Sequence, residues 1–429
     1  MAKQKITPLD AWIRESTGLR EISGQSLGEY HFRKLGEIVD YAKTKSRFYR
    51  ARFAGFGEME KLSDFQALPF TTPLDVLNGS NDFLCVPPDE ISRIVTLRTS
   101  GTTGKGKRIF FTREDQELTV DFFECGMSTF TARGDRTLIF LPGETPGGVG
   151  DLLKRGLGRL GAHSDVYGPI SDHSDSKRIF LEYSPDVVVG LPSQMFRLSA
   201  ETAGGISPKS VLLASDNMPR DLCDAIRRNW KCEVFTHYGL TETGLGGAVT
   251  CAADAGYHMR ENDLYFEIVD PEYGRPVPDG EYGEIVITTL NHRGMPLIRY
   301  RTGDASRILT QECECGSALR RLEGISGRIN EPLQLRSGQN ISIKTLDDIL
   351  YGSPGVLSFS AYLADDAKNG GETLVISITQ ADRNAAMPAI PELDGLPVKV
   401  VLKKGEQDFF TTGVAKRRIE DRRKTPPPA

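Results

Sequence analysis

Four short apolar runs in the middle of the chain constrain its fold more than any other feature. They read RTLIFLPG (136–143), PDVVVGLPS (185–193), KSVLLASD (209–216) and CEVFTHYG (232–239). The stretches between them are long enough for helices, as in MPRDLCDAIRRNW (218–230). Because parallel strands need long crossover connections that are usually helical, this alternation predicts an α/β fold, with a mostly parallel sheet flanked by helices.

The regions on either side follow different patterns. Up to about residue 70 the sequence reads as helical, because LGEIVDYAKTKSRFYRARF (35–53) carries apolar residues three and four positions apart. From 264 to 290, two strand-like runs are joined by a connection rich in Pro, Gly and Asp. This segment therefore predicts an antiparallel pair of strands.

A second change of pattern follows residue 325. VLSFSAYLADD (356–366) and TLVISITQ (373–380) predict further strands there. We therefore expect a large domain over residues 1–325 and a small α+β domain over 326–424. The Pro-rich end, 425–429, is expected to be disordered.

The composition of the chain predicts a soluble enzyme. The chain has 429 residues, of which 39% are hydrophobic, enough to bury a substantial core. A formal net charge of -5, with basic residues gathered only in 416–424, argues against a general nucleic-acid binder. Neither a signal-peptide-like stretch nor a run of about 20 apolar residues is present. We expect a cytoplasmic protein that binds neither nucleic acid nor membrane.

The seven cysteines do not form a disulfide pattern and fit a reducing compartment. Four stand alone in apolar or helical contexts, where a small buried hydrophobic residue is the expected role: Cys85, Cys125, Cys223 and Cys232. The others form a possible cluster with one histidine: Cys251, His258, Cys313 and Cys315. Three thiols and an imidazole suit tetrahedral Zn²⁺. The alternative is a set of reduced buried thiols with His258 on a loop.

A glycine- and hydroxyl-rich loop lies in LRTSGTTGKGKRIFFT (97–112). It fits the G-x-x-x-x-G-K part of a P-loop, but Arg108 stands where that motif requires Ser or Thr for magnesium. A conventional P-loop ATPase is therefore disfavoured. A phosphate-binding loop of another kind would use backbone N–H groups together with the side chains of Thr99, Ser100, Thr102, Thr103, Lys105 and Lys107. A plain Gly-rich turn is the alternative.

Four motifs occur in a fixed order: TSGTTGKGK (99–107), YGLTETG (238–244), YRTGD (300–304) and GRIN (327–330). Together they resemble the AMP-forming acyl-adenylate superfamily of acyl-CoA synthetases, nonribosomal adenylation domains and luciferases. Within it, GLPSQMFRLSA (190–200) and CECGSALRRLEGISGRIN (313–330) are similar to the phenylacetate-CoA ligase branch. The resemblance implies a large acyl-adenylate-forming N-terminal domain and a small, mobile C-terminal domain that closes over the site.

The resemblance also implies roles for individual residues. The pyrophosphate would be held by Ser100, Gly101, Thr102, Thr103, Gly104 and Lys105. The adenine pocket would be lined by Ser215 and Asp216, with Tyr238 and Gly239 beside the base. Taken singly, Tyr238 could equally be a core residue.

Further roles concern the phosphates, the metal and the ribose. Thr241 and Glu242 would contact the phosphates and Mg²⁺, which usually takes one or two carboxylates together with substrate phosphates. Asp304 would accept hydrogen bonds from both ribose hydroxyls, because a carboxylate offers two acceptor oxygens. Arg328 would lie near the phosphates or the domain junction. Singly, Glu242 could be a helix N-terminal acid and Asp304 a turn residue.

The resemblance strengthens the metal hypothesis, because the phenylacetate-CoA ligase branch carries similar Cys/His and Cys-x-Cys segments. A Zn²⁺ held by Cys251, His258, Cys313 and Cys315 would be structural, since four protein ligands leave no open position for water.

One departure from the superfamily concerns its catalytic lysine. In TTGVAKRRIEDRR (411–423), the place of that lysine is taken by Val414. Lys416 lies two residues later, on the same face of an extended segment, and could substitute as the catalytic lysine. The alternative for Lys416 is a solvated member of a basic tail. Asn330, in GRIN, is a milder departure at the hinge.

The sequence therefore predicts an AMP-forming ligase that uses ATP, Mg²⁺ and coenzyme A on a small-molecule carboxylic acid. FLPGETPGGVGDLL (140–153) and HYGLTETGLGG (237–247) supply a Gly-rich, partly apolar wall, which favours an aromatic or medium-sized acid. Two alternatives stay open: an adenylating enzyme that acylates a carrier protein, an amine or a protein cysteine, and a nucleotide-binding protein that has lost catalysis, for which Val414 is the supporting feature. The resemblance also suggests a homodimer.

Overall fold

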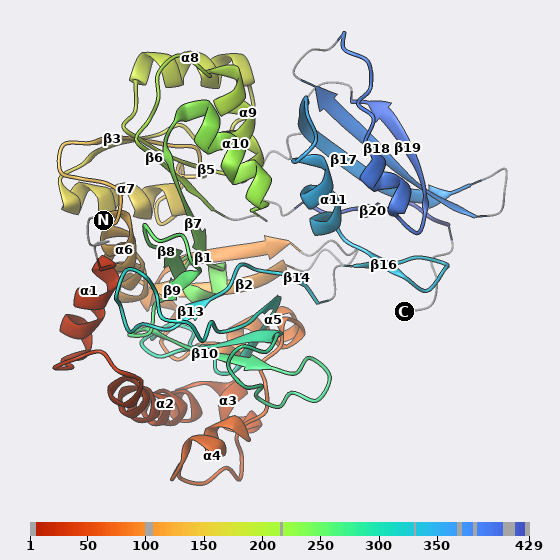
Figure 1. Ribbon diagram of the computed structural model, residues 1–429. Helices are drawn as coiled ribbons and strands as arrows, with labels where there is room; N and C mark the ends of the chain where they lie inside the picture. The colour runs from red at the N-terminus through yellow and green to blue at the C-terminus, as the bar shows by residue number, and fades with distance from the viewer. Residues whose placement is uncertain are drawn as a thin grey trace. The chain divides into compact units, whose positions relative to one another are not determined.

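The computed structural model describes residues 6–98, 106–214, 218–329, 332–366, 371–380, 384–405 and 417–424. The chain divides into two compact units, whose helices and strands are drawn in Figure 1. Unit 1 comprises Met1–Gly134, Gly143–Ser164 and Phe235–Ile325, and unit 2 comprises Asp135–Pro142, Asp165–Val234 and Ser326–Ala429. Each unit is therefore assembled from segments far apart in the sequence.

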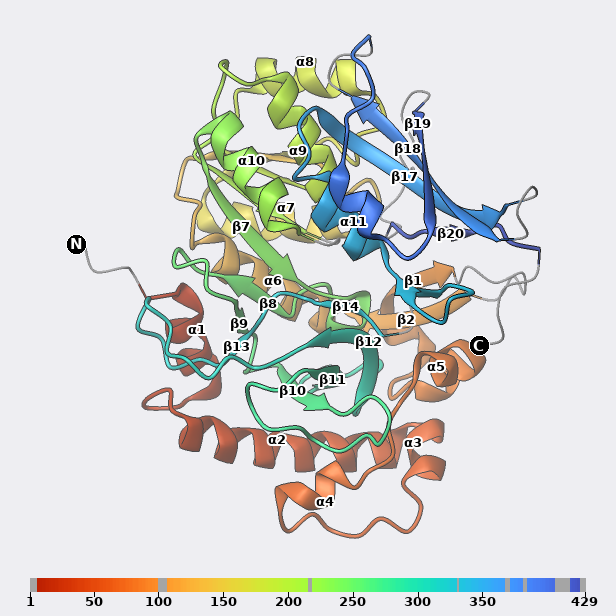
Figure 2. The ribbon, with the colours of Figure 1, turned by 45° about the vertical axis from the view of Figure 1, so that its right-hand side comes forward.

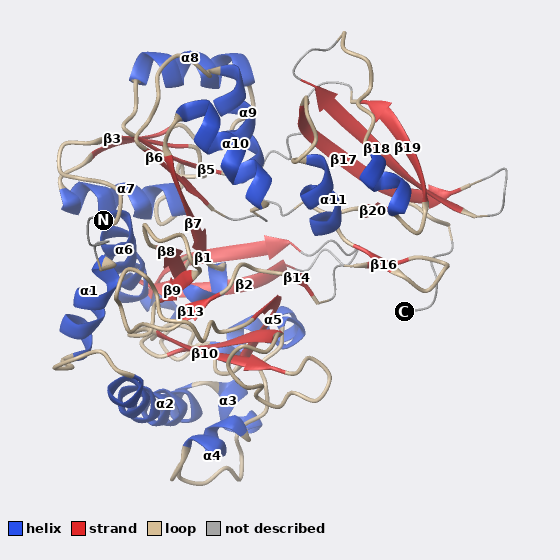
Figure 3. Cartoon of the chain, viewed as in Figure 1, coloured by secondary structure: helices blue, strands red, loops and turns tan. Residues whose placement is uncertain are grey.

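Unit 2 contains the predicted parallel strands. β3 (Arg136–Ile139) pairs in parallel with β5 (Val187–Gly190), and β5 with β6 (Ser210–Leu213). Every residue of β5 and β6 is buried, which is why these strands read as unbroken apolar runs. The connecting helices are α8 (His173–Tyr183), α9 (Pro192–Glu201) and α10 (Arg220–Trp230). The predicted α/β fold is confirmed (Figure 3).

The C-terminal part of unit 2 is an α+β arrangement. Its sheet has the order β19-β18-β17-β20, and Figures 1 and 2 both show β17, β18 and β19 side by side. The elements are β14 (Gly327–Arg328), β15 (Leu333–Gln334), β16 (Asn340–Ile341), α11 (Ile343–Leu350), β17 (Val356–Asp365), β18 (Glu372–Gln380), β19 (Lys399–Lys404) and β20 (Glu420–Asp421). The ring of Tyr351 packs edge-on against Phe196 of α9 at a centroid distance of 5.6 Å. The domain boundary predicted after residue 325 stays a prediction, and 425–429 lies outside the described residues.

Unit 1 is built from a helical N-terminal segment and antiparallel strands. The helices are α1 (Pro8–Thr17), α2 (Gly24–Lys45), α3 (Arg47–Arg52), α4 (Leu62–Gln66), α5 (Pro73–Gly79), α6 (Arg113–Met127) and α7 (Val149–Leu160). The strands are β1 (Ile91–Arg98), β2 (Gly106–Thr112), β8 (Ala248–Thr250), β9 (Tyr257–Met259), β10 (Leu264–Val269), β11 (Gly283–Thr289), β12 (Tyr300–Ser306) and β13 (Arg321–Leu322). Two strands, β4 (His163–Val166) and β7 (Glu233–Tyr238), cross from one unit to the other. The helical start and the antiparallel pair predicted over 264–290 are both observed.

The start of α6 is fixed by a buried carboxylate. Thr112 and Asp115 form a reciprocal cap, in which each side chain accepts a hydrogen bond from the backbone N–H of the other. Asp115 also accepts the N–H groups of Arg293 and Gly294, at 2.7 and 3.0 Å. The capping carboxylate thus ties the β2–α6 junction to the loop that leads into β12.

A second buried charge connects the N-terminal helices to the β10–β11–β12 sheet. Arg299 is 2% exposed and forms an ion pair with Glu267 at 3.0 Å. Its guanidinium also donates to the carbonyl oxygen of Leu68 at 2.6 Å and lies 4.1 Å from the ring centre of Phe70. Since a buried charge must be compensated, these contacts fix the 66–70 segment against the sheet.

The four single cysteines are buried, as predicted. Burial raises the pKa of Cys85 and Cys125 to about 12, and that of Cys232 to about 11. These thiols are therefore protonated, and they act as small apolar groups in the core. Among the described residues, no helix combines the length and the apolar character needed to cross a membrane.

Arg299→Leu tests the buried ion pair, because it leaves Glu267 as an uncompensated buried carboxylate. We expect the free energy of unfolding, measured in urea, to fall by about 3–5 kcal/mol, and the double variant with Glu267→Leu to recover much of it. Glu37→Gln, at a half-exposed pair on α2, is the matched control and should cost less than about 1 kcal/mol. Equal losses for Arg299→Leu and Glu37→Gln would contradict this account.

Candidate functional site

The turn after β7 presents several of the predicted site residues. β7 ends at Tyr238, and Thr241–Thr243 form a short 3₁₀ helix. Gly239 is required at the start of this turn, because a Cβ there would lie 2.3 Å from the carbonyl oxygen of Leu245. The close approach of the backbone to itself thus sets where Thr241 and Glu242 lie.

Tyr238 and Asp304 are brought together from separate strands. The Tyr238 hydroxyl, on β7, donates a hydrogen bond to Asp304 Oδ2, on β12, at 3.2 Å. Both side chains are buried. Burial, reinforced by the Asp304 carboxylate, raises the pKa of Tyr238 well above its ordinary value, so the hydroxyl keeps its proton as a donor.

Glu242 lies in a buried triangle of polar groups. Its carboxylate forms an ion pair with Lys107 of β2 and accepts a hydrogen bond from the Tyr300 hydroxyl at 2.8 Å. The Lys107 ammonium in turn donates to the Tyr300 hydroxyl at 2.9 Å. Burial alone would raise the pKa of Glu242, but the Lys107 charge and the hydrogen bonds outweigh it and lower that pKa. Glu242 is therefore ionised near neutral pH.

Tyr300 was not among the residues predicted for the site. Tyr300 and Asp304 lie four positions apart on β12, where buried residues alternate with half-buried ones, so both point to the same face. One face of β12 thus meets both Tyr238 and Glu242. The sequence feature that could have identified Tyr300 as a site residue is its position at the start of the YRTGD motif.

The remaining predicted site residues either lie outside the described residues or lie in unit 2. Those outside the described residues are Ser100, Gly101, Thr102, Thr103, Gly104, Lys105, Ser215, Asp216 and Lys416, together with Thr99, Asn330 and Val414. Arg328 is exposed on β14, in unit 2. Next to Lys416 in the sequence, Arg417 pairs with the buried Asp347 at 2.5 Å and lies 5.2 Å from the ring centre of Tyr351.

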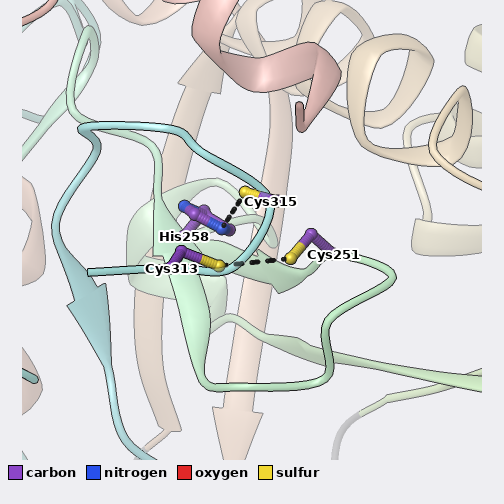
Figure 4. A group of neighbouring side chains, drawn as sticks. All are labelled: Cys251, His258, Cys313 and Cys315. Carbon is purple, nitrogen blue, oxygen red and sulfur yellow. Dashed lines mark hydrogen bonds between the residues drawn. The ribbon is translucent and has the colours of Figure 1, made fainter. Parts of the chain in front are cut away.

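The structure brings all four predicted cysteine and histidine ligands together (Figure 4). Their ligand atoms lie within 4.8 Å of one another and all four residues are buried. Cys251 Sγ lies 3.6 Å from Cys313 Sγ, and Cys315 Sγ lies 3.5 Å from His258 Nε2. Burial lowers the pKa of His258 to about 4, so its imidazole is neutral, the form that binds metals.

Comparison with known proteins identifies the family. The model of the AMP-binding enzyme family matches residues 56–291. The chain belongs to this family. It is 30% identical over 338 residues to phenylacetate-coenzyme A ligase of Pseudomonas putida, covering 74% of this chain and 74% of that protein. The phenylacetate-coenzyme A ligase of Thermus thermophilus is 29% identical over 343 residues, covering 76% and 75%. The predicted resemblance to this branch of the AMP-binding enzymes is confirmed.

Solved structures share the fold. The crystal structure of 2-hydroxyisobutyryl-CoA ligase in the postadenylation state with 2-HIB-AMP has a TM-score of 0.79 at 21% identity, covering 94% of this chain and 91% of that chain. An anthranilate CoA ligase in complex with anthranoyl-AMP has a TM-score of 0.54 at 16% identity, covering 74% and 65%. The AMP-binding enzyme described here therefore has the fold of acyl-adenylate-forming ligases.

Lys107→Met tests the buried triangle, because it leaves the Glu242 carboxylate without its countercharge. We expect a loss of about 3–5 kcal/mol in the free energy of unfolding at pH 7, most of it recovered by Lys107→Met combined with Glu242→Gln. Urea unfolding of the single and double variants gives the coupling between the two side chains.

The loss should depend on pH. In the wild type, the lowered pKa of Glu242 contributes stability above the ordinary value of 4.5, and this stability is lost as pH falls through the folded-state pKa. In Lys107→Met, burial acts without the lysine and raises that pKa, so stability falls as pH rises above 4.5. The gap between the two proteins should therefore widen from pH 4 to pH 7; a constant gap would contradict the assignment.

Proposed function

We propose that this AMP-binding enzyme activates a carboxylic acid with ATP to an acyl adenylate and transfers the acyl group to coenzyme A. The observation that carries the proposal is that Tyr238, at the end of β7, and Glu242, in the turn after it, both contact β12, through Asp304 and Tyr300 respectively. The similarity to curated phenylacetate-coenzyme A ligases supports both ATP and coenzyme A as reactants.

The chemistry consists of two substitutions. A carboxylate oxygen of the acid attacks the α-phosphorus of ATP, and the bond to the bridging oxygen breaks to release pyrophosphate. The thiolate of coenzyme A then attacks the acyl carbonyl carbon, and AMP leaves. Since both substrates of the first step are anions, the main task of the protein is to position them and neutralise their charge.

Asp304 and Glu242 have distinct roles in this proposal. Asp304 would accept hydrogen bonds from the two ribose hydroxyls, with Tyr238 beside the adenine base. Glu242 offers Mg²⁺ a hard oxygen ligand, and a magnesium ion there would supply positive charge at the phosphates. Lys107 pairs with one oxygen of the same carboxylate, so its ammonium would lie beside a magnesium ion held by Glu242 and would add to the positive charge there.

The acid is proposed to be aromatic. The segments 140–153 and 237–247 are rich in glycine and apolar residues, a composition that suits a flat apolar ring. Coenzyme A is favoured over a carrier protein or an amine as the acceptor, because the curated relatives at 29–30% identity are coenzyme A ligases. The cytoplasmic location and the homodimer stay predictions.

The decisive measurement is pyrophosphate release from ATP and Mg²⁺ over a panel of aryl and fatty acids, with and without coenzyme A. We expect release that depends on an aryl acid, with acyl-CoA as the product. Asp304→Asn should raise the KM for ATP about ten- to a hundredfold, because it weakens charged hydrogen bonds to the ribose. Lys416→Ala should lower kcat about a hundred- to a thousandfold, and Glu37→Gln should change neither parameter.

Other outcomes would favour the alternatives. Adenylation without consumption of coenzyme A would indicate a different acyl acceptor. Binding of ATP without pyrophosphate release from any acid would favour a non-catalytic nucleotide-binding protein, for which Val414→Lys is the variant to assay next.

We also propose that Cys251, His258, Cys313 and Cys315 hold a structural Zn²⁺. Four atoms placed tetrahedrally about 2.0–2.3 Å from a zinc ion lie roughly 3.3–3.8 Å apart. The separations of 3.6 Å between Cys251 and Cys313 and 3.5 Å between Cys315 and His258 fall in this range. Three thiolates and an imidazole complete the coordination, so the ion would support the fold and take no part in the reaction.

Metal analysis of the purified protein should find about one zinc per chain. Cys313→Ser should lose the metal and lower the Tm, because binding free energy at a structural site contributes to folding. Cys125→Ala, at a buried cysteine outside the cluster, is the control and should keep its zinc. Equal zinc content in Cys313→Ser and the wild type would reject the site.

A further inference from the structure

Unit 1 contains a polar cavity of about 590 Å³ that none of the roles proposed above uses. Its walls come from three parts of the chain: the start of α3, the end of α5 with the turn that follows it, and the paired strands β1 and β2. The volume is within the range typical of small-molecule sites.

The cavity lies on the opposite face of β2 from Glu242. Successive side chains of a strand point to opposite faces, and Lys107 points to Glu242. The next residue, Arg108, lines the cavity, as does Thr96, its partner on β1. A ligand in this cavity would therefore be separate from the metal and the phosphates proposed to lie at Glu242.

The cavity has an excess of positive charge. Among the described residues that line it, the charged ones are Arg47, Asp82 and Arg108. Arg47 forms an ion pair with Asp82 at 3.4 Å. Arg108 donates to the neutral amide oxygen of Asn81 at 3.1 Å and forms no ion pair with a described residue. One guanidinium group thus has no countercharge, and its planar set of donors matches the geometry of a phosphate.

Neutral donors lie beside the guanidinium groups and are held in place. Because the Asn81 oxygen accepts from Arg108, the amide nitrogen of Asn81 remains a donor at the cavity wall. The buried Ser80 hydroxyl accepts the backbone N–H of Arg108 at 3.2 Å and donates to the carbonyl oxygen of Val76 in α5. These bonds fix the end of α5 against β2, so the donors from the two elements keep their relative positions.

We propose that this cavity binds a phosphate group, held by Arg47, Arg108 and the amide of Asn81. The identity of the phosphate rests on the proposed ligase function, which has two candidates besides the phosphates of ATP: the 3′-phosphate of coenzyme A and the pyrophosphate released in the first step. The cavity is much larger than a phosphate requires, which favours a phosphate carried on a nucleoside, as in coenzyme A. The Arg47 side chain is 83% exposed, so the attraction depends on charge and should weaken as salt is added.

The test measures binding of coenzyme A, dephospho-coenzyme A and pyrophosphate by calorimetry, with the nucleotide site filled by Mg²⁺ and α,β-methylene-ATP. In the wild type we expect coenzyme A to bind about ten- to a hundredfold more tightly than dephospho-coenzyme A, because the 3′-phosphate adds charged hydrogen bonds. Arg108→Gln should remove most of this ratio by weakening coenzyme A alone. Asp82→Asn should increase it, because Asp82 competes with the phosphate for Arg47.

Arg50→Gln is the matched control, since Arg50 lies on α3 but does not line the cavity; it should leave the ratio unchanged. Equal binding of the two coenzymes, together with pyrophosphate binding that weakens in Arg108→Gln, would assign the site to free pyrophosphate. Binding of all three probes that is absent, or unchanged by Arg108→Gln and Asp82→Asn, would overturn the inference.

The ligase function is tested separately by pyrophosphate release over the acid panel. Absence of release in a protein whose coenzyme ratio responds to Arg108→Gln would overturn the ligase function and leave the phosphate site standing. Release of pyrophosphate with a ratio that does not respond would do the reverse.

Discussion

The buried carboxylate of Glu242 is the group on which the arrangement of unit 1 depends. This carboxylate is ionised and almost completely buried, so its negative charge needs a countercharge and hydrogen-bond donors. Two separate elements supply them: Lys107 of β2 and Tyr300 of β12. These contacts join the start of β2 to the turn after β7 and to the strand that carries Asp304. A single electrostatic requirement thus holds together segments that are far apart in the sequence.

The cysteine and histidine cluster includes a residue of β9, two strands from β7 in the sheet order. His258 of β9 pairs with Val249 of β8, which pairs with His237 of β7. β8 and β9 have three residues each, too few to persist without further support. Cys251, Cys313 and Cys315 form a small separate core cluster. A metal bound there would provide the stability that so few apolar contacts cannot, and would hold β7 in register.

The sequence predicted the elements more completely than the contacts of the site. Parallel strands buried on both faces are unbroken apolar runs, so β3, β5 and β6 could be recognised directly. Cys251 and Cys313 lie 62 residues apart; their donor chemistry suggested a common metal site, and the family resemblance strengthened that hypothesis. Nothing near Tyr300 indicates that its hydroxyl meets Glu242, 58 residues earlier. Such partners are set by tertiary packing, which no local pattern encodes.

The pairing of Lys107 also bears on the departure at Val414. The superfamily pattern places a lysine at that position, and this chain has an apolar residue there, with Lys416 two positions later. Lys107 pairs with Oε1 of Glu242. A magnesium ion held by the same carboxylate would add its own positive charge beside the ammonium, and both would favour the phosphate anions. Lys107 thus provides, from β2, a cation beside Glu242 that does not depend on residue 414.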